Sequence, residues 1–413
     1  LSENYKYTRG NWDIYIAFFE KAFNLAKHQA TISYITPDKW LTKPFGEIFR
    51  TDTLKYLSVL LKSGRDIFES VGVDSIVTIF ANESKSFAFK EYEDANVVEK
   101  YIIPKDIFIK PYQLDIVFSP FLGLLLNLTK SHKPLSKFGC VCENACATSD
   151  AYELKSILKN ISNGIDCAKY YKVINTGTVD KFNSRWGKKE MTYLKDKYIC
   201  PAVSIRDFHR LFPNTYGEKP SKKKLIIKGL TLLDATIDFE GEYVPGKTTL
   251  IIASEKMNYL SYLAIVINSK LAQFYITQRY SSASYNGGVN FTKDMINNLP
   301  LPKAPTEFLF LFLSKALVIV KNNELDALIQ YFYCLANSVI YELYFPDEIK
   351  STNAEILKHL NNLPELKDDW SDDKKISVIK KVYKELSCPV HPVSIAIEQQ
   401  KQIPEVRIIE GLD

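Results

Sequence analysis

Positively charged side chains gather with aromatic and amide side chains in three segments of the chain, and these offer the clearest chemistry in the sequence. Lysine and arginine hold phosphate groups, whereas arginine, asparagine and serine also read the edges of bases. Each segment alone is equally typical of a solvated loop, but three in one region indicate a nucleic-acid partner. The candidate binding residues are Arg185, Trp186, Lys188 and Lys189, then Lys222 and Lys223, then Arg279, Tyr285 and Asn286.

A different kind of phosphate site is suggested by the segment from Gly241 to Thr248, which matches the pattern G-x-x-x-x-G-K-[ST]. That loop binds phosphate only between a buried strand and a helix whose N-terminus faces the ligand. Residues 249–253, Thr-Leu-Ile-Ile-Ala, are instead typical of a strand. We therefore interpret the match as the turn of a β-hairpin.

Nucleophilic and metal-assisted catalysis have little support in the sequence. The five histidines stand alone in ordinary contexts, and the acidic residues between positions 368 and 373 lie in a polar tail typical of a solvated loop. Cys140, Cys142 and Cys146 lie close together, but a structural zinc site needs a second pair of ligands, and none follows nearby. Buried or unreactive thiols are the first interpretation here, and a metal site is the alternative.

The bulk properties set the class of protein. A length of 413 residues allows two or three domains, and a hydrophobic content of 46% excludes disorder. No apolar run is long enough to span a bilayer, so we expect no membrane partner. The seven cysteines, odd in number and mostly scattered, favour a reducing, cytoplasmic compartment. The net charge of +5 permits a nucleic-acid partner without requiring one.

The first 80 residues carry an α/β pattern. A helix is predicted over residues 12–27, with Ile14, Ala17, Phe18, Ala22 and Leu25 on one apolar stripe, and a second helix over 46–54. Strands are predicted over residues 31–35, 56–61 and 75–80. This alternation predicts a mostly parallel sheet flanked by helices. Such a sheet does not normally open with a helix, so we expect the first half of this domain to be missing.

The sequence pattern changes twice over the remainder of the chain. Residues 91–99 are charged and polar and look like a linker that ends a unit at about residue 95. Residues 96–305 contain short β-rich runs with turn residues, and residues 306–413 have helical periodicity. The predicted fold class is therefore α/β plus α+β: a partial doubly wound sheet, a mixed β-rich domain and a helical C-terminal region.

The order of these pieces resembles the C-terminal part of adenine-N6 DNA methyltransferases fused into type IIG restriction-modification enzymes. In the first unit, the resemblance lies in residues 10–15 (GNWDIY), 32–40 (ISYITPDKW) and 67–79. Residues 110–302 resemble a TaqI-type target-recognition domain. The residues that carry this resemblance are 173–180 (VINTGTVD), Trp186 with Gly187, 264–269 (AIVINS) and 291–302 (FTKDMINNLPLP). Residues 335–344 (LANSVIYELY) resemble the helix that closes such chains.

The resemblance implies a half methyltransferase domain over residues 1–95, a target-recognition domain over 96–305 and a helical region over 306–413. The adenine amino group is unreachable inside a duplex, so the base must be flipped out and restacked on an aromatic face. By resemblance, Phe68 is that aromatic platform. Lys39 and Lys43 could hold phosphates beside it, although solvated lysines are the alternative. Double-stranded DNA is then the implied partner.

The cofactor and catalytic motifs of the family are not found in this sequence. The chain contains no Asp-Pro-Pro or Asn-Pro-Pro, and the glycine-rich loop that binds S-adenosylmethionine is also absent. We therefore expect no cofactor-binding residues here, no methylation or cleavage of DNA by this chain alone, and activity only with the missing N-terminal half. Mg²⁺ is implied only if a nuclease domain lies upstream.

Two other classes remain open. A non-enzymatic specificity subunit working with a separate methyltransferase would also read DNA. Such subunits usually carry two recognition halves, whereas this chain has one behind methyltransferase-like strands. A protein-interaction scaffold unrelated to DNA is the third class, and it would show no DNA binding even at low salt.

Overall fold

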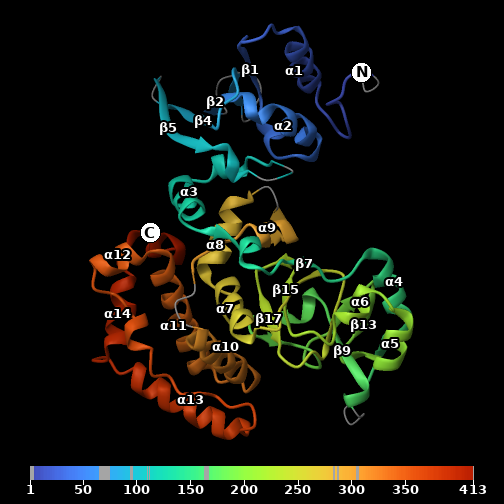
Figure 1. Ribbon diagram of the computed structural model, residues 1–413, viewed down its shortest axis with the longest axis vertical. Coiled ribbons are helices and arrows are strands. Elements are labelled where there is room, and N and C mark those ends of the chain that lie inside the picture. The colour runs from blue at the N-terminus through green and yellow to red at the C-terminus, as the bar shows by residue number, and fades with distance from the viewer. Residues whose placement is uncertain are drawn as a thin grey trace. The chain divides into compact units, whose positions relative to one another are not determined.

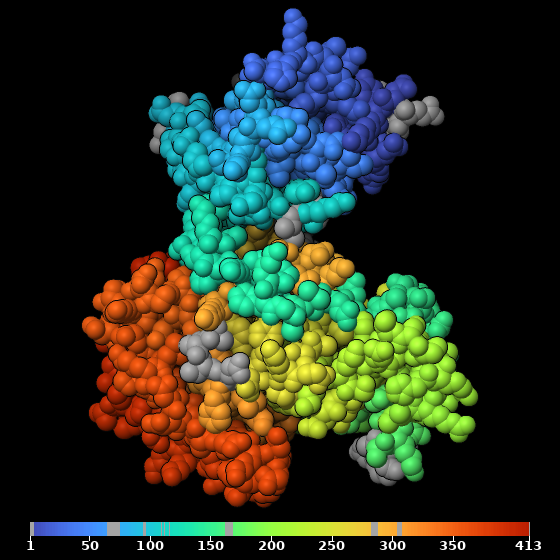
Figure 2. Space-filling model, in the orientation of Figure 1, coloured from blue at the N-terminus to red at the C-terminus, as the bar shows by residue number. Residues whose placement is uncertain are grey.

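The computed structural model describes residues 4–64, 75–93, 96–108, 110, 112–161, 167–281, 284–285, 288–303 and 307–412. The chain divides into two compact units, drawn in Figures 1 and 2. Unit 1 comprises Leu1–Lys130 with Gln278–Ser282, and unit 2 comprises Ser131–Thr277 with Ala283–Asp413. The predicted division into three domains stays a prediction. None of the described helices is long and apolar enough to cross a membrane.

Unit 1 contains most of the elements that its sequence predicts. The helices near residues 12–27 and 46–54 and all three predicted strands are present, and the third strand has the predicted bounds. The elements are α1 (Ile14–Leu25), β1 (Ile32–Pro37), α2 (Glu47–Thr53), β2 (Leu57–Gly64), β3 (Ser75–Phe80), β4 (Ser86–Glu93) and β5 (Asn96–Pro104), followed by α3 (Leu122–Ser131). Asp13 caps α1, because its side chain accepts a hydrogen bond from the Ile14 N–H.

The sheet of unit 1 has the strand order β1-β3-β2-β4-β5. The expectation of a mostly parallel sheet is wrong, because only the neighbours β2 and β4 are parallel and the other three pairs are antiparallel. The reason is that β3 turns back and inserts between β1 and β2, and β5 turns back beside β4. Consequently β1 and β2 run in the same direction, separated by one reversed strand.

The polar segment at residues 91–99 is not a linker, because it forms the end of β4 and the start of β5 (Figure 1). Its charges pair across the two strands. Lys90 lies 3.5 Å from Glu99, and Lys100 lies 2.8 Å from Glu93. A hairpin that exposes most of its side chains has the composition of a linker, and this explains the error.

An aromatic cluster forms the core between the sheet and its helices. Phe19 from α1 lies 4.8 Å from Phe49 of α2 and 5.7 Å from Trp40, measured between ring centroids, and Phe80 of β3 closes the cluster. Three members of the predicted apolar stripe of α1 face away from the core, since Ile14, Phe18 and Leu25 are 52%, 57% and 70% exposed, whereas Ala17 is buried as predicted. The helix therefore has two apolar faces, of which only one is covered within the described part of unit 1.

Unit 2 begins with small sheets and short helices. Its first elements are β6 (Lys133–Pro134), β7 (Glu143–Asn144), α4 (Thr148–Ile157), β8 (Lys159–Asn160), β9 (Tyr170–Ile174), β10 (Val179–Asp180), β11 (Asn183–Ser184), β12 (Met191–Tyr193), β13 (Asp196–Tyr198), β14 (Pro201–Ser204), α5 (Ile205–Leu211) and α6 (Thr215–Glu218). There follow β15 (Lys224–Lys228), β16 (Leu230–Thr231), β17 (Ala235–Asp238), β18 (Tyr243–Pro245) and β19 (Thr249–Ala253).

Helices dominate the rest of the chain, as its periodicity predicts. The remaining elements are α7 (Met257–Ile267), α8 (Lys270–Arg279), β20 (Ser284–Tyr285), β21 (Gly288–Asn290), α9 (Lys293–Asn297), β22 (Pro300–Leu301), α10 (Glu307–Asn322), α11 (Asp326–Tyr344), α12 (Pro346–Ser351), α13 (Asp372–Leu386), α14 (Pro392–Gln400) and α15 (Pro404–Glu410). The long helices α10, α11 and α13 all lie within residues 306–413, the region for which helical periodicity is predicted.

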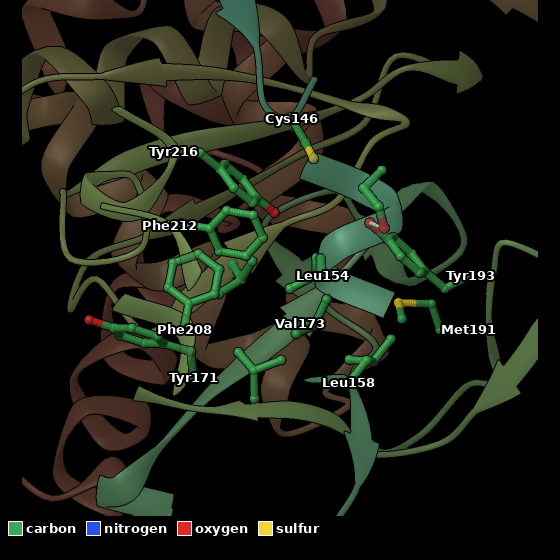
Figure 3. Packing of buried hydrophobic residues seen from close by; sticks show 13 residues of the cluster. Cys146, Leu154, Leu158, Tyr171, Val173, Met191, Tyr193, Phe208, Phe212 and Tyr216 are labelled. Carbon is green, nitrogen blue, oxygen red and sulfur yellow. Dashed lines mark hydrogen bonds between the residues drawn. The ribbon is translucent and has the colours of Figure 1, made fainter. Parts of the chain in front are cut away.

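Two four-stranded sheets form the β-rich part of unit 2, with orders β18-β9-β14-β8 and β17-β15-β19-β7. Beside the first sheet, Phe208, Phe212 and Tyr216 pack ring against ring, with centroids 4.9–5.5 Å apart (Figure 3). Leu154 of α4 and Val173 of β9 are fully buried in the same cluster. This core fixes the scaffold from which the loops of the β-rich part extend.

The adjacent residues Phe18 and Phe19 test the aromatic core of unit 1. Phe19→Ala removes a ring with 0% exposure, and we expect it to lower the free energy of unfolding by about 3–5 kcal/mol. Phe18→Ala is the matched control on the exposed face and should stay within about 0.5 kcal/mol of the wild type. Urea unfolding measures both, and equal losses would contradict the assignment of the two faces.

Candidate nucleic-acid interface

The carboxyl ends of β1 and β2 meet at one edge of the unit 1 sheet, which we call the strand-end edge. Pro37 at the end of β1 and Gly64 at the end of β2 both pair with Ser75, the first residue of β3. The segment after β1 and the connection after β2 therefore leave the sheet at the same edge. In α/β sheets this is where ligands bind.

The segment after β1, residues 38–46, is held in place by a buried arginine. Arg50 of α2 is 1% exposed, and its Nη1 donates hydrogen bonds to the carbonyl of Trp40 and, at 2.9 Å, to that of Lys43. Gly46 must lack a side chain, because a Cβ there would lie 2.2 Å from the Trp40 oxygen. A guanidinium that donates hydrogen bonds to two backbone carbonyls at once fixes the shape of the turn.

A second segment supports the same turn from outside. The Gln113 amide donates to the Thr42 carbonyl at 3.0 Å, and the Leu114 N–H donates to the Leu41 carbonyl at 3.0 Å. Lys39 and Lys43 project from this supported turn, and both are exposed. Neither forms an ion pair within the described residues, so both ammonium groups can meet an anion.

Phe68, the residue assigned to base stacking by resemblance, lies outside the described residues. Its connection, residues 65–74, starts and ends at the strand-end edge, because β2 ends at Gly64 and β3 begins at Ser75. Tyr15 of α1 also comes close to the turn, and its ring lies 6.5 Å from that of Phe45. Burial, followed by the charges of Asp13 and Asp38, raises the pKa of Tyr15, so its hydroxyl stays protonated.

In unit 2, the motif at residues 173–180 is held by a hydrogen-bond network around Asn175. The Asn175 side-chain oxygen accepts hydrogen bonds from the Thr248 N–H at 3.1 Å and from the Thr248 hydroxyl at 2.6 Å. Thr178 exchanges hydrogen bonds with the Asn175 backbone. Gly246 must be glycine, because a Cβ there would lie 2.9 Å from the Asn175 oxygen. The motif thus positions the hairpin β10–β11 that follows it.

The first predicted cluster lies just after this hairpin. The side chain of Arg185 is 55% exposed, and its Nε lies 3.5 Å from Asp180. Lys188 pairs with Glu324 at 2.7 Å, whereas exposed Lys189 has no ion pair among the described residues. Trp186 is packed, because its indole N–H donates to the Pro201 carbonyl at 2.7 Å. Arg185 and Lys189 are therefore the most available members of the cluster.

Asp180 anchors the hairpin to α10. Its carboxylate lies 3.1 Å from the Lys321 ammonium and also accepts a hydrogen bond from the Lys181 N–H. Burial is the largest single effect and raises the pKa of Asp180. The charge and hydrogen bond of Lys321, the Lys181 N–H and the charge of Arg185 together outweigh it, so the pKa of Asp180 lies below its usual value. The hairpin therefore depends on an ionised carboxylate.

The second cluster contains one surface lysine that is paired and one that is partly buried. Lys222 pairs with Glu218 at 2.9 Å, and Lys223 is half-buried with no ion pair among the described residues. Their neighbour Lys224 is 0% exposed and bonds to Asp238 at 2.5 Å. Burial lowers the pKa of Lys224, while the charge of Asp238 opposes this.

The segment that resembles a phosphate-binding loop is not the turn of a β-hairpin, contrary to the prediction, because β15 separates β17 from β19 and the segment itself contains β18. Asp238 accepts hydrogen bonds from the backbone N–H groups of Gly241, Glu242 and Tyr243 at 2.9–3.1 Å. The next regular element is the strand β19, not a helix. The N–H groups that a phosphate would need are thus bound to a carboxylate.

The structure gives Arg279 a packing role instead of a base-reading one. Its side chain is 3% exposed, and its guanidinium carbon lies 5.4 Å from the Phe108 ring and 5.1 Å from the Tyr280 ring. Its Nη2 donates to the Ile107 carbonyl at 3.2 Å. A contact to guanine would require it to leave these partners. Tyr285 is described only as part of β20, and Asn286 lies outside the described residues.

Two thiols of the cysteine cluster, those of Cys142 and Cys146, are held in their protonated form. Burial raises the pKa of the Cys142 thiol well above its usual range and that of Cys146 to about 11. The Asn297 side chain is bonded to both the N–H and the carbonyl of Cys142. Within the described residues, no group of histidine, cysteine or acidic side chains could hold a metal ion.

Comparison with known proteins finds one segment of the chain that is similar to a family. Residues 1–62 match the family model of the Eco57I restriction-modification methylases. No curated protein matches the sequence.

Three solved structures of restriction-modification enzymes are similar, each at 10% identity. The match to the type IIG restriction endonuclease BpuSI has a TM-score of 0.33 and covers 96% of this chain and 50% of that chain. The type IIL enzyme MmeI in complex with DNA has a TM-score of 0.39, with coverages of 89% and 51%. A nuclease-deletion mutant of the type ISP enzyme LlaGI, in complex with a DNA substrate mimic, has a TM-score of 0.31, with coverages of 74% and 31%. This chain spans about half the length of the first two.

Sequence reasoning missed Arg50 and Tyr15. Arg50 is the only basic residue between Lys43 and Lys55. Arginine is usually exposed in proteins, so this pattern did not indicate that its side chain is buried. Tyr15 carried no signal either.

Arg50→Met tests the closure of the turn. The substitution leaves the Trp40 and Lys43 carbonyls without their donor, so we expect a loss of about 2–4 kcal/mol in unfolding free energy. Hydrogen exchange should accelerate at the Thr42, Lys43 and Gly46 amides, which donate within the turn. Lys43→Ala is the control and should keep this protection. Unchanged exchange in Arg50→Met would show that the turn stands without the guanidinium.

Asp180→Asn tests the anchor of the hairpin through its pH dependence. The folded pKa is lowered, so the carboxylate stabilises the fold above its unfolded value, near pH 4, and this contribution disappears as pH falls through the folded pKa. We expect the variant to be about 1 kcal/mol less stable than the wild type at pH 7. The difference should shrink as the pH falls below 4 through the lowered pKa of Asp180. Glu324→Gln, at an exposed pair, is the control, and a pH-independent difference for Asp180→Asn would refute the role of its charge.

Proposed function

We propose that this chain is the DNA-recognition portion of a restriction-modification adenine-N6 DNA methyltransferase. It reads a specific duplex sequence and supports a flipped adenine for methyl transfer from S-adenosylmethionine. One observation carries the proposal. The segment that matches the methylase family, residues 1–62, contains β1, the turn closed by Arg50 and most of β2, which build the strand-end edge.

At this edge the residues have distinct roles. Phe68 stacks on the extruded adenine, because base–aromatic stacking returns about 1–3 kcal/mol of the unstacking cost. Lys39 and Lys43 hold backbone phosphates beside it, which suits exposed ammonium groups without ion pairs. S-adenosylmethionine, bound by the partner segment, would supply the methyl group for the adenine N6.

Sequence reading is assigned to the loops of unit 2. Arg185 offers a guanidinium that can bind a guanine edge in bidentate fashion. Lys188, Lys189 and Lys222 provide phosphate contacts that set the position of the domain on DNA without reading bases. The hydrogen bonds of Asn175 and the ion pair of Asp180 with Lys321 support this role, because a loop that is fixed before binding loses less entropy on binding.

The complete active site needs a second protein segment that carries the cofactor loop and the Asn/Asp-Pro-Pro-aromatic motif. Two features of unit 1 support such a partner. The outer face of α1 presents Ile14, Phe18 and Leu25 to solvent. In addition, β1 is an edge strand of its sheet, because β3 is its one neighbour within the described part of unit 1. S-adenosylmethionine is therefore assigned to the partner segment, as is Mg²⁺ if that segment includes a nuclease.

The test is methyl transfer to duplex DNA by this chain together with the cofactor-binding segment. Phe68→Ala should slow transfer by about 5–150-fold, corresponding to the loss of 1–3 kcal/mol of stacking. Phe68→Tyr, which keeps the ring, should retain most of the activity. Phe308→Ala replaces a partly exposed phenylalanine of α10 and should leave the rate unchanged.

Calorimetry on the chain alone completes the test. We expect weak or no binding of S-adenosylmethionine without the second segment. Tight binding by the isolated chain would overturn the assignment of the cofactor to a partner. Normal transfer by Phe68→Ala would refute the stacking role.

A further inference from the structure

Helix α13 presents a row of lysines on its outward face. Lys374, Lys381 and Lys384 follow each other at helical spacing with Ser377 between them, Lys380 flanks the row, and all are exposed. The four lysines are called the α13 stripe from here on. The stripe extends over about 15 Å of helix, which matches the rise of about four nucleotides of one DNA strand.

The opposite face of α13 fixes the helix on unit 2. Ile379, Val382 and Leu386 are buried, and the helix contacts α10 and α11. The Tyr383 ring meets the Tyr331 ring edge-on, with centroids 5.0 Å apart. Ser371 caps the helix by accepting a hydrogen bond from the Lys374 N–H. Helix α13 lies at the outside of the C-terminal helices (Figure 1).

The charge of the stripe is not neutralised by the part of the chain that the structure describes. Lys380, Lys381 and Lys384 form no ion pair there, and Lys374 lies 4.1 Å from the centroid of the Trp370 ring. Other lysines of the same region are paired: Lys358 with Glu355 at 3.1 Å and Lys401 with Glu398 at 2.6 Å. The acidic residues of α13 itself are confined to its ends, with Asp372 and Asp373 in the first turn and Glu385 in the last.

We propose that the α13 stripe binds the phosphate backbone of duplex DNA, outside the loops that read sequence. Lysine ammonium groups act as flexible point charges, which suit phosphate oxygens and carry no base readout. Each phosphate they neutralise releases condensed counterions, so the contact adds affinity that falls with salt. The choice of DNA as the polyanion rests on the proposed function, whereas the contact itself is independent of sequence.

The experiment measures binding of the full chain to a random-sequence duplex between 50 and 200 mM salt. The variant Lys381→Ala/Lys384→Ala removes two unpaired charges and keeps a good helix former at both positions. We expect the slope of log K against log salt to flatten by about 1.8, or 0.9 per contact. Lys358→Ala/Lys401→Ala removes the same net charge from paired lysines and is the matched control, with a slope equal to that of the wild type.

The outcomes separate this proposal from the methyltransferase assignment. Equal slopes for wild type and Lys381→Ala/Lys384→Ala overturn the α13 contact even if methyl transfer is seen. Equal flattening in both double variants also overturns it, because net charge alone would then be responsible. Failure of the wild type to bind random duplex at low salt does the same. A flattened slope confined to the α13 variant supports the contact, even where methyl transfer fails.

Discussion

The architecture of unit 1 depends on the insertion of β3 between β1 and β2. An antiparallel strand between two others forces them to run in the same direction, and the register places Pro37 and Gly64 opposite the same residue, Ser75. That coincidence makes one edge out of two strand ends that are 27 positions apart in sequence, from residue 37 to residue 64. The turn after β1 and the connection that contains Phe68 share an edge for this reason alone.

A shared edge is useful for binding only if the segments leaving it are rigid, and both units solve this problem with buried hydrogen-bonding groups. Arg50 closes the turn at residues 38–46 from within, whereas in unit 2 Asn175 and Asp238 each gather backbone donors from a neighbouring loop. A buried polar side chain that satisfies several backbone groups is costly to remove, because each group left behind loses its partner. The loops are thus held by groups that have no contact with a ligand themselves.

The sequence predicted local structure well and pairing poorly. The runs that became α11, β3 and β19 have strong periodicity or β-branched content, so their type and ends were readable. Strand partners are set by contacts distant in sequence, and this is why the sheet was expected to be mostly parallel. The same limit applies to α1, where Phe18 and Phe19 are adjacent and equally apolar. Which of them faces the core depends on rings from α2 and β3 that periodicity does not reveal.

Cations were the least predictable part of the candidate site, because composition counts charges without regard to what surrounds them. Arg50, Arg279 and Lys224 are buried and bonded within the protein, so they cannot release counterions from DNA. Lys188 and Lys222 are exposed but paired with carboxylates, and binding a phosphate would mean exchanging one anion for another.

The net charge of +5 therefore says little about affinity for DNA. The quantity that matters is the number of exposed lysines and arginines without an anion nearby. Among the described residues these include Lys39 and Lys43, Lys189 and the α13 stripe, and also lysines elsewhere, such as Lys21 and Lys256. An exposed lysine without such an anion can bind a phosphate without first releasing a carboxylate. The electrostatic contribution of a lysine to DNA binding therefore depends on its local partners and not on the net charge of the chain.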